Sequence, residues 1–217
     1  MILGAGRGDR MRPLTDRIPK PLLRVGGDTL IGHQIRRLRA AGIRELVINH
    51  AHLGEQIEAT LGDGRAYGVS IRYSPERDAL ETGGGIFRAL PLLRGGPFLV
   101  TNGDIWCDLD YGALSIARDD LAQIVLVDNP SHHARGDFSL SDGRVHRDGE
   151  ERLTFAGIGI YRPELFAACR PGKFPLAPLL HHAMDLGKVG GTHHRGEWMD
   201  IGTPRRLEEL SARLGHR

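Results

Sequence analysis

The chain has 217 residues, of which 40% are hydrophobic and 26% are charged, and its formal net charge at pH 7 is +2. This length and composition predict one globular domain over residues 1–217, without room for a second catalytic domain. The basic residues are scattered, so no nucleic-acid or membrane partner is expected. We see no apolar run near ~18 residues and no secretory leader, and we therefore expect a cytoplasmic protein. No obligatory protein partner is evident.

Apolar runs typical of strands alternate along the chain with amphipathic stretches typical of helices. Strands are predicted at residues 1–3, 46–48, 69–73, 98–100 and 124–127. Helices are predicted after Thr29, which can cap the first one, at residues 53–61 and 86–93, and from Thr203 and Pro204 onward. This alternation indicates an α/β fold of the Rossmann-like type, with a mainly parallel sheet and helices on both faces.

The pattern changes between Gly136 and Tyr161, where short alternating runs are separated by turn signals at Asp142-Gly143 and Asp148-Gly149. These features predict a small antiparallel extension that forms one wall of a cleft. Ligands of sheets of this kind collect at the carboxyl ends of the strands.

The most informative segment reads LGAGRGDRMRPLT at residues 3–15 and is followed by PKPL at residues 19–22. Its glycines, Gly4, Gly6 and Gly8, have no Cβ, so backbone N–H groups can approach a phosphate closely. Arg10 and Lys20 supply the positive charge that a polyphosphate requires. The segment therefore predicts a cradle for a nucleoside triphosphate.

Two better-known glycine-rich loops do not match this segment. A dinucleotide fingerprint requires a third glycine where Asp9 stands, and a Walker A loop requires a G-K-[ST] triplet that the sequence lacks.

Asp104 and Asp200 each follow a short apolar or aromatic stretch that reads as a strand end. Carboxylate oxygens are the ligands that Mg²⁺ prefers, and we predict these two residues as its ligands. The alternatives are that Asp104 makes a turn and that Asp200 caps the last helix. Asp108 and Asp110 are nearby candidates that we expect to be exposed.

Histidine and cysteine residues give weaker signals. The pairs at residues 132–133, 181–182 and 193–194 suggest metal ligands, but adjacent side chains point apart on a helix or strand. We expect these histidines to be hydrogen-bonded or solvated. Cys107 and Cys169 lack C-x-x-C spacing, so neither a zinc site nor a disulfide framework is expected.

Taken together, these motifs resemble the signature of the sugar-1-phosphate nucleotidyltransferases, L-x-G-G-x-G-T-R-L-x-P-L-T followed by P-K-P-L. Ala5 replaces one glycine of the signature and Asp9 replaces its threonine. This variant is similar to the short uridylyltransferases that act on N-acetylmuramate 1-phosphate. The resemblance covers nearly the whole chain, through ETGGG at residues 81–85, NGD at 102–104, GDF at 136–138 and DIGT at 200–203.

The resemblance implies transfer of UMP from UTP to N-acetylmuramate 1-phosphate during peptidoglycan recycling, with release of pyrophosphate. It assigns Arg10 to the β- and γ-phosphates, Lys20 to the α-phosphate, and Asp104 and Asp200 to Mg²⁺. Its nucleotide-binding positions are Gly4, Ala5, Gly6, Gly8, Arg10, Lys20, Thr82 and Gly83, and its sugar-contacting positions are Asn102 and Asp137.

Arg135 precedes Asp137 by two residues, and its forked guanidinium suits the carboxylate that distinguishes N-acetylmuramate from N-acetylglucosamine. The alternative is that Arg135 belongs to an exposed basic loop.

Two other functions remain open at this stage. One keeps the chemistry but uses mannose or glucose 1-phosphate with GTP or dTTP. The other is a catalytically silent regulator that binds a sugar nucleotide, which has no need of the two aspartates.

Overall fold

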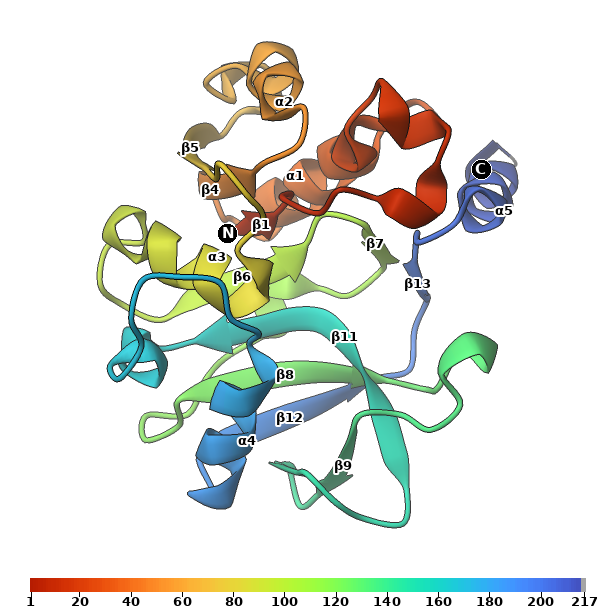
Figure 1. The fold of residues 1–217 in the computed structure, drawn as a ribbon. Coiled ribbons are helices and arrows are strands. Elements are labelled where there is room, and N and C mark those ends of the chain that lie inside the picture. Colours follow the sequence, from red (N-terminus) through yellow and green to blue (C-terminus); the bar gives the residue numbers. More distant parts are fainter. Residues whose placement is uncertain (216–217) are drawn as a thin grey trace.

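The computed structural model describes residues 1–215, so the last two residues of the predicted domain lie outside the described range. One sheet has nine strands in the order β5-β4-β1-β6-β11-β8-β12-β10-β9 (Figure 1). These strands are β1 (Ile2–Leu3), β4 (Glu45–His50), β5 (Ser70–Pro75), β6 (Phe98–Asn102), β8 (Ala122–Val127), β9 (Phe138–Ser141), β10 (Arg144–His146), β11 (Arg152–Tyr161) and β12 (Val189–His194). Two short ladders pair β2 (Arg24–Val25) with β3 (Asp28–Thr29) and β7 (Ile105–Cys107) with β13 (Trp198–Asp200).

Helices cover both faces of the sheet, as the alternating pattern predicts (Figure 1). They are α1 (Leu30–Ala40), α2 (Gly54–Leu61), α3 (Glu81–Ala89), α4 (Ala177–Asp185) and α5 (Pro204–Gly215). Short 3₁₀ helices fill the connections at η1 (Asp9–Met11), η2 (Leu14–Asp16), η3 (Lys20–Leu22), η4 (Arg65–Tyr67), η5 (Leu90–Leu92), η6 (Tyr111–Ala113), η7 (Ser131–His133) and η8 (Pro163–Phe166). None of the described helices is long and apolar enough to cross a membrane.

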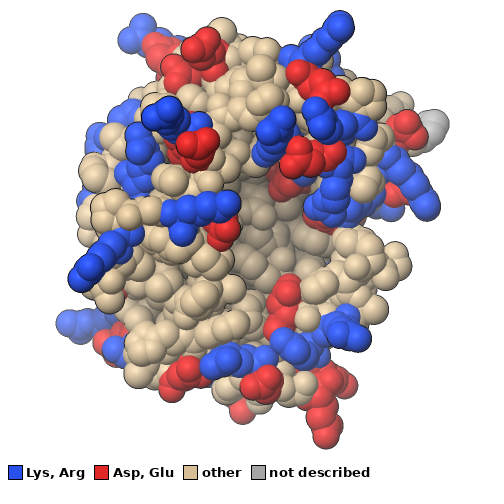
Figure 2. Space-filling view, in the orientation of Figure 1, with Lys and Arg blue, Asp and Glu red and all other residues tan. Residues whose placement is uncertain are grey.

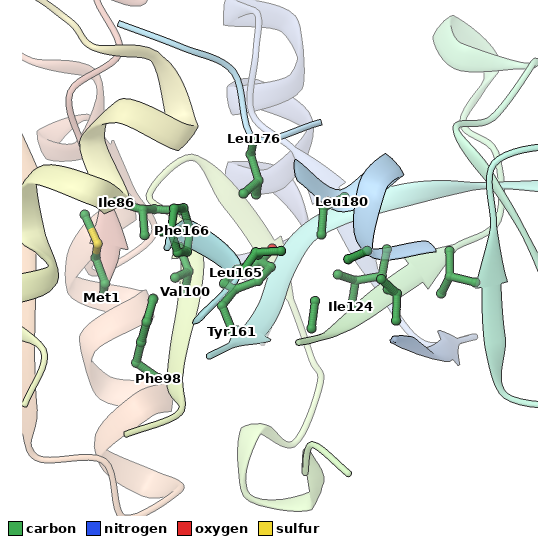
Figure 3. Close-up of a cluster of buried hydrophobic side chains, with 14 of the residues drawn as sticks. Met1, Ile86, Phe98, Val100, Ile124, Tyr161, Leu165, Phe166, Leu176 and Leu180 are labelled. Carbon is green, nitrogen blue, oxygen red and sulfur yellow. The ribbon is translucent and has the colours of Figure 1, made fainter. Parts of the chain in front are cut away.

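Each face of the sheet has its own apolar core. Val47 belongs to the cluster that α3 and α4 cover, whereas its neighbours Leu46 and Ile48 belong to the cluster under α1 and α2. This division follows from the alternation of side chains along a strand. Figure 3 shows the first cluster, in which Ile86 of α3 and Leu180 of α4 lie over the strands. Because both faces are apolar and covered, the polar groups gather where the strands end.

The predicted helices at α1 and α2 are confirmed. Thr29 caps α1 by accepting a hydrogen bond of 3.0 Å from the backbone N–H of Gly32, and Gly62 follows the end of α2. The predicted C-terminal helix is also confirmed, as α5. Leu210 is buried in a third cluster with Met11 and Ile201, so the C-terminal helix packs beside the glycine-rich loop.

The predicted α/β fold is confirmed, but its antiparallel part is larger than a short extension. β11 lies between β6 and β8 and runs antiparallel to both. Ala156 and Ile158 of β11 face one core, while Leu153 and Phe155 pack against the other. Apolar side chains on both faces are typical of an interior strand. The turn signals before β11 predict only a small antiparallel extension. Burial of apolar side chains on both faces of β11 instead places this strand inside the sheet.

The helix that was predicted to begin at Ile86 begins at Glu81 instead, so the three glycines at residues 83–85 lie inside α3. Glycine is a poor helix former, but here it permits close packing. A Cβ at Gly84 would lie 2.3 Å from the carbonyl oxygen of Gly172, and a Cβ at Gly83 would lie 2.6 Å from the ring of Phe174. Contact with the segment at residues 172–175 therefore outweighs helix propensity.

Replacing Gly84 by alanine should lower the free energy of unfolding by about 1–3 kcal/mol, because the added Cβ overlaps a backbone oxygen. Helix propensity alone predicts the opposite sign, a gain of ~1 kcal/mol. Urea unfolding measures the difference. Gly96→Ala is the matched control, since a Cβ there would meet no atom of residues 1–215 within 4 Å. Equal stability of the two variants would contradict the packing argument.

Candidate active site

A hollow of about 210 Å³ lies where β1, β4 and β6 end. Figure 2 shows the molecule hollowed near the centre of the view, with acidic and basic side chains along the upper rim. The hollow brings together seven predicted site residues, Gly4, Ala5, Gly6, Lys20, Thr82, Asn102 and Asp104. Motifs that are far apart in the sequence thus meet at the carboxyl edge of the sheet, as the strand-end rule predicts.

The glycine-rich loop after β1 approaches its neighbours closely. A Cβ at Gly4 would lie 2.9 Å from the carbonyl oxygen of Asn49, and Gly8 adopts a φ of +73°, which favours glycine. A Cβ at Gly6 would meet no atom of the described residues within 4 Å, although Gly6 lines the hollow. The backbone at Gly6 is therefore open to a ligand.

Lys20 lies at the start of η3, and its side chain is only 9% exposed. Its ammonium donates a hydrogen bond to Oδ2 of Asp104, which immediately precedes β7. A charge that is so deeply buried needs an anionic partner, because desolvation otherwise disfavours it. The Asp104 carboxylate therefore fixes the Lys20 ammonium at the hollow.

Asp200 lies beside Asp104, although the two residues come from distant parts of the chain. Asp200 at the end of β13 pairs with Ile105 of β7, and the backbone N–H of Ile201 donates a 2.7 Å hydrogen bond to the carbonyl oxygen of Asp104. The Asp200 carboxylate accepts a hydrogen bond from Arg206 of α5. His132 Nε2 lies 3.0 Å from the same carboxylate oxygen.

The donor set at this point fits a divalent cation. Asp200 ends one strand of the β7–β13 ladder and Asp104 directly precedes the other, so their backbones are held together, and both offer hard carboxylate oxygens. Asp104 and Asp200 pair with the cations Lys20 and Arg206, whereas the alternative ligands contact other groups. Asp108 bonds to His194 Nε2 at 2.8 Å, and Asp110 accepts a 2.8 Å hydrogen bond from the N–H of Gly112 at the start of η6.

Arg10 lies on η1 and is exposed. A Cβ built on Gly202 would lie 3.1 Å from Nη2 of Arg10, and also 3.1 Å from Oδ2 of Asp200. The structure thus brings the Arg10 guanidinium to the Asp200 carboxylate.

The predicted sugar-contacting residues occupy different surroundings. The side chain of Asn102 lies over Gly157, where a Cβ would approach it to 2.4 Å. The Asp137 carboxylate accepts a 2.8 Å hydrogen bond from the N–H of Phe155, and its other oxygen lies 2.9 Å from His133 Nε2. Asp137 therefore anchors the corner between β9 and β11. Arg135 is exposed and lies outside the residues that line the hollow.

Gly83 also lies outside the lining residues, because it faces Phe174 within α3. Gly8 contacts Thr15 and Lys20 and supports the loop from behind.

The histidine pairs are hydrogen-bonded, as predicted, at four positions: His132, His133, His193 and His194 each contact an aspartate. One grouping was not anticipated. Cys107, Asp108 and His194 present possible ligand atoms within 4.8 Å of one another. Burial raises the pKa of the Cys107 thiol to about 11, so it is protonated at neutral pH and is a poor metal ligand.

Sequence reasoning missed a buried polar network beneath the hollow. Asn49 Oδ1 accepts a 3.0 Å hydrogen bond from the N–H of Gly4, and its Nδ2 donates a 2.7 Å hydrogen bond to Glu76. The second oxygen of Glu76 accepts a 2.8 Å hydrogen bond from the N–H of Leu80. The strand-end rule could have found Asn49, the next-to-last residue of β4, because it directly follows the apolar run LVI. No local signal marks Arg206 or His132.

This fold and site are those of a nucleotidyltransferase, and the family model described as nucleotidyl transferase matches residues 1–140. The chain belongs to this family. It is 53% identical to an N-acetylmuramate alpha-1-phosphate uridylyltransferase from Neisseria meningitidis, over 99% of this chain and 97% of that protein. It is 38% identical to the protein of the same name from Caulobacter vibrioides, over 99% of this chain and 96% of that protein.

More distant relatives share the fold. A mannose-1-phosphate guanylyltransferase catalytic subunit from Danio rerio is 28% identical, and the match covers 94% of this chain but 61% of that protein. A crystal structure assigned as a glucose-1-phosphate thymidylyltransferase from Bacillus anthracis, in complex with a sucrose, superimposes with a TM-score of 0.84 at 21% identity. That match covers 98% of this chain and 93% of the other.

Glu76→Ala should lower the free energy of unfolding by about 2–4 kcal/mol, because it leaves the buried donors on Asn49 and Leu80 without an acceptor. Glu76→Gln should cost less, since its amide keeps one acceptor oxygen. Denaturant unfolding at neutral pH compares the two variants with Glu55→Ala, a control at an exposed carboxylate. A loss no larger than that of the control would rule out the network as a support of the glycine-rich loop.

Proposed function

We propose that this protein transfers UMP from UTP to N-acetylmuramate 1-phosphate, giving UDP-N-acetylmuramate and pyrophosphate. The observation that carries the proposal is the 53% identity, over nearly the full length of both chains, to a relative of that name. The hollow that contains Lys20 and Asp104, with Asp200 beside it, supports a nucleotidyl transfer at this place. The reaction belongs to the recycling of peptidoglycan sugars in the cytoplasm.

The chemistry requires little proton transfer. A phosphate monoester has its second pKa near ~6, so the sugar phosphate is already an effective nucleophile at neutral pH. One of its oxygens forms a bond to the α-phosphorus of UTP, the bond from that phosphorus to the bridging oxygen breaks, and pyrophosphate leaves with the electron pair. The protein contributes alignment of the two phosphates and neutralisation of their charge.

Each residue has a distinct role in this reaction. Lys20 neutralises charge where the sugar phosphate and the α-phosphate meet, and Arg10 binds the β- and γ-phosphates. Asp104 and Asp200 hold Mg²⁺, which supplies further neutralisation of phosphate oxygens when it is bound. The backbone from Gly4 to Gly6, together with Thr82, holds the nucleoside, while Asn102 and Asp137 position the sugar.

A pyrophosphate-release assay with purified protein tests the reaction. UTP with N-acetylmuramate 1-phosphate should give the highest kcat/KM among combinations of UTP, GTP and dTTP with muramyl, glucosaminyl, mannosyl and glucosyl phosphates. Higher activity with GTP and mannose 1-phosphate, or with dTTP and glucose 1-phosphate, would replace the proposal by that specificity. Binding of sugar nucleotide without any turnover would indicate a regulator instead.

Asp104→Asn and Asp200→Asn should each lower kcat by about 10²-fold or more, because each removes an anionic ligand from a hard-cation site. Activity should also vanish on chelation and return with added Mg²⁺. Asp108→Asn serves as the control for a neighbouring carboxylate, since Asp108 bonds to His194 instead. Normal turnover in both test variants would refute the metal assignment.

A further inference from the structure

Two carboxylate–cation pairs lie next to each other at the end of the hollow. Lys20 pairs with Asp104, and Arg206 pairs with Asp200. The proposed function assigns Lys20 to a phosphate of the substrate, so this first pair joins a metal ligand to a phosphate-binding cation. The second pair has the same composition, but nothing yet assigns a role to Arg206.

The guanidinium of Arg206 is only partly used by its contacts with the protein. Its Nη1 donates to Asp200 and lies 2.9 Å from His132 Nε2, and its Nε lies 3.3 Å from Thr203 Oγ1. Its Nη2 faces Gly202, where a Cβ would approach it to 2.8 Å. The side chain is 14% exposed, so these contacts hold it in a defined position.

Arg10 reaches the same point from the opposite side. The Cβ position on Gly202 that lies 2.8 Å from Arg206 Nη2 also lies 3.1 Å from Arg10 Nη2. Two guanidinium groups from η1 and α5 therefore converge on one glycine, which has no side chain to separate them. Oδ2 of Asp200 lies 3.1 Å from the same Cβ position and compensates these two like charges, and the N–H groups of the guanidinium groups also match the oxygens of a phosphate.

Asp200 supplies the negative charge that keeps Arg206 in this position. When its carboxylate is engaged by a divalent cation, the attraction between Asp200 and Arg206 weakens, and the guanidinium needs another anion. His132 Nε2 contacts both groups, at 2.9 Å from Arg206 Nη1 and 3.0 Å from Asp200 Oδ1. Arg206 is thus able to exchange the carboxylate for a phosphate without leaving its place on α5.

A second hollow, of about 490 Å³, is lined by Asp200 and, among residues 1–215, shares no lining residue with the first. It is lined by residues of η7, β13 and α5, among them His132, Trp198, Thr203 and Arg206. A small polyanion that is held by Arg206 would therefore have open space beside Asp200.

We propose that Arg206 binds the pyrophosphate portion of the nucleotide together with Arg10, and that it retains the released pyrophosphate beside Asp200. This inference rests on the proposed function, because it names a residue for the leaving group of that reaction. It predicts a selective effect on pyrophosphate, since Arg206 is not among the residues that line the hollow with Thr82 and Asn102.

The test is the reverse reaction, in which UDP-N-acetylmuramate and pyrophosphate give UTP and N-acetylmuramate 1-phosphate. Arg206→Ala should raise the KM for pyrophosphate by roughly 10- to 150-fold, which corresponds to the ~1.5–3 kcal/mol of a charge-assisted hydrogen bond. The KM for UDP-N-acetylmuramate should change little. Arg206→Lys should recover part of the affinity, because it keeps the charge but loses the fork.

Arg36→Ala is the control for net charge. It removes the same charge from an exposed side chain of α1 that pairs with Asp28 and lines neither hollow. Its KM for pyrophosphate should stay near the wild-type value. A similar rise in both variants would assign the effect to net charge, and a parallel rise of both KM values in Arg206→Ala would assign it to a displaced Asp200. Either outcome would overturn the proposal.

Calorimetric titration of the wild-type protein and the three variants with inorganic pyrophosphate and Mg²⁺ gives a readout that is independent of turnover. Arg206→Ala should bind pyrophosphate more weakly by the same factor, and thermal unfolding should show that it is folded. Unchanged binding would overturn the role of Arg206. A different result would show that the proposed function itself is wrong. In that case the wild-type protein would bind pyrophosphate but would form no UDP-N-acetylmuramate.

Discussion

The pairing of β7 with β13 is the constraint on which the rest of the site depends. It consists of a three-residue ladder, extended by the 2.7 Å hydrogen bond between the N–H of Ile201 and the carbonyl oxygen of Asp104. This ladder is separate from the nine-stranded sheet, and it brings Asp200 to the edge where Asp104 already stands. It also sets the start of α5, whose Leu210 packs with Met11 beside the glycine-rich loop. The C-terminal segment is therefore part of the site, because it supplies one carboxylate and supports the loop that is predicted to bind the phosphates.

The electrostatics of the site follow from this geometry. Two carboxylates at adjacent positions repel each other, and each is compensated by a cation, Lys20 or Arg206. The side chains of both cations are largely buried, so loss of a carboxylate would leave an uncompensated charge, which costs several kcal/mol. In the proposed reaction, binding of a metal and a triphosphate would exchange partners among charges that are already desolvated. Such an exchange requires less desolvation than the assembly of the same charges from water, and it keeps the cations in position for the transferred phosphate.

Local signals in the sequence predict the parts of the fold that local physics determines. Thr29 and Gly62 mark helix ends because a cap and a left-handed glycine are properties of a few residues. The strand-end rule correctly gathers the glycine-rich loop and Asp104 at one hollow. The start of α3 and the place of β11 depend instead on distant contacts, with Gly172 in one case and with β6 and β8 in the other. Arg206 was missed for the same reason: its partner Asp200 lies on the preceding strand, and nothing in the sequence shows that α5 folds back toward Arg10.

The η7 turn connects the two ends of the site more directly than the sheet does. Its consecutive residues His132 and His133 contact Asp200, the predicted metal ligand, and Asp137, the predicted sugar-contacting residue. Because Asp137 is also fixed by the N–H of Phe155, the turn is tied to β11 at one end and to β13 at the other. A connection of two adjacent residues has far fewer conformations than a long loop. Little conformational entropy is therefore lost when the η7 turn holds Asp137 at a fixed distance from Asp200. In the proposed reaction, in-line displacement requires such a fixed distance between the two phosphates, and the contacts of His132 and His133 would help to maintain it.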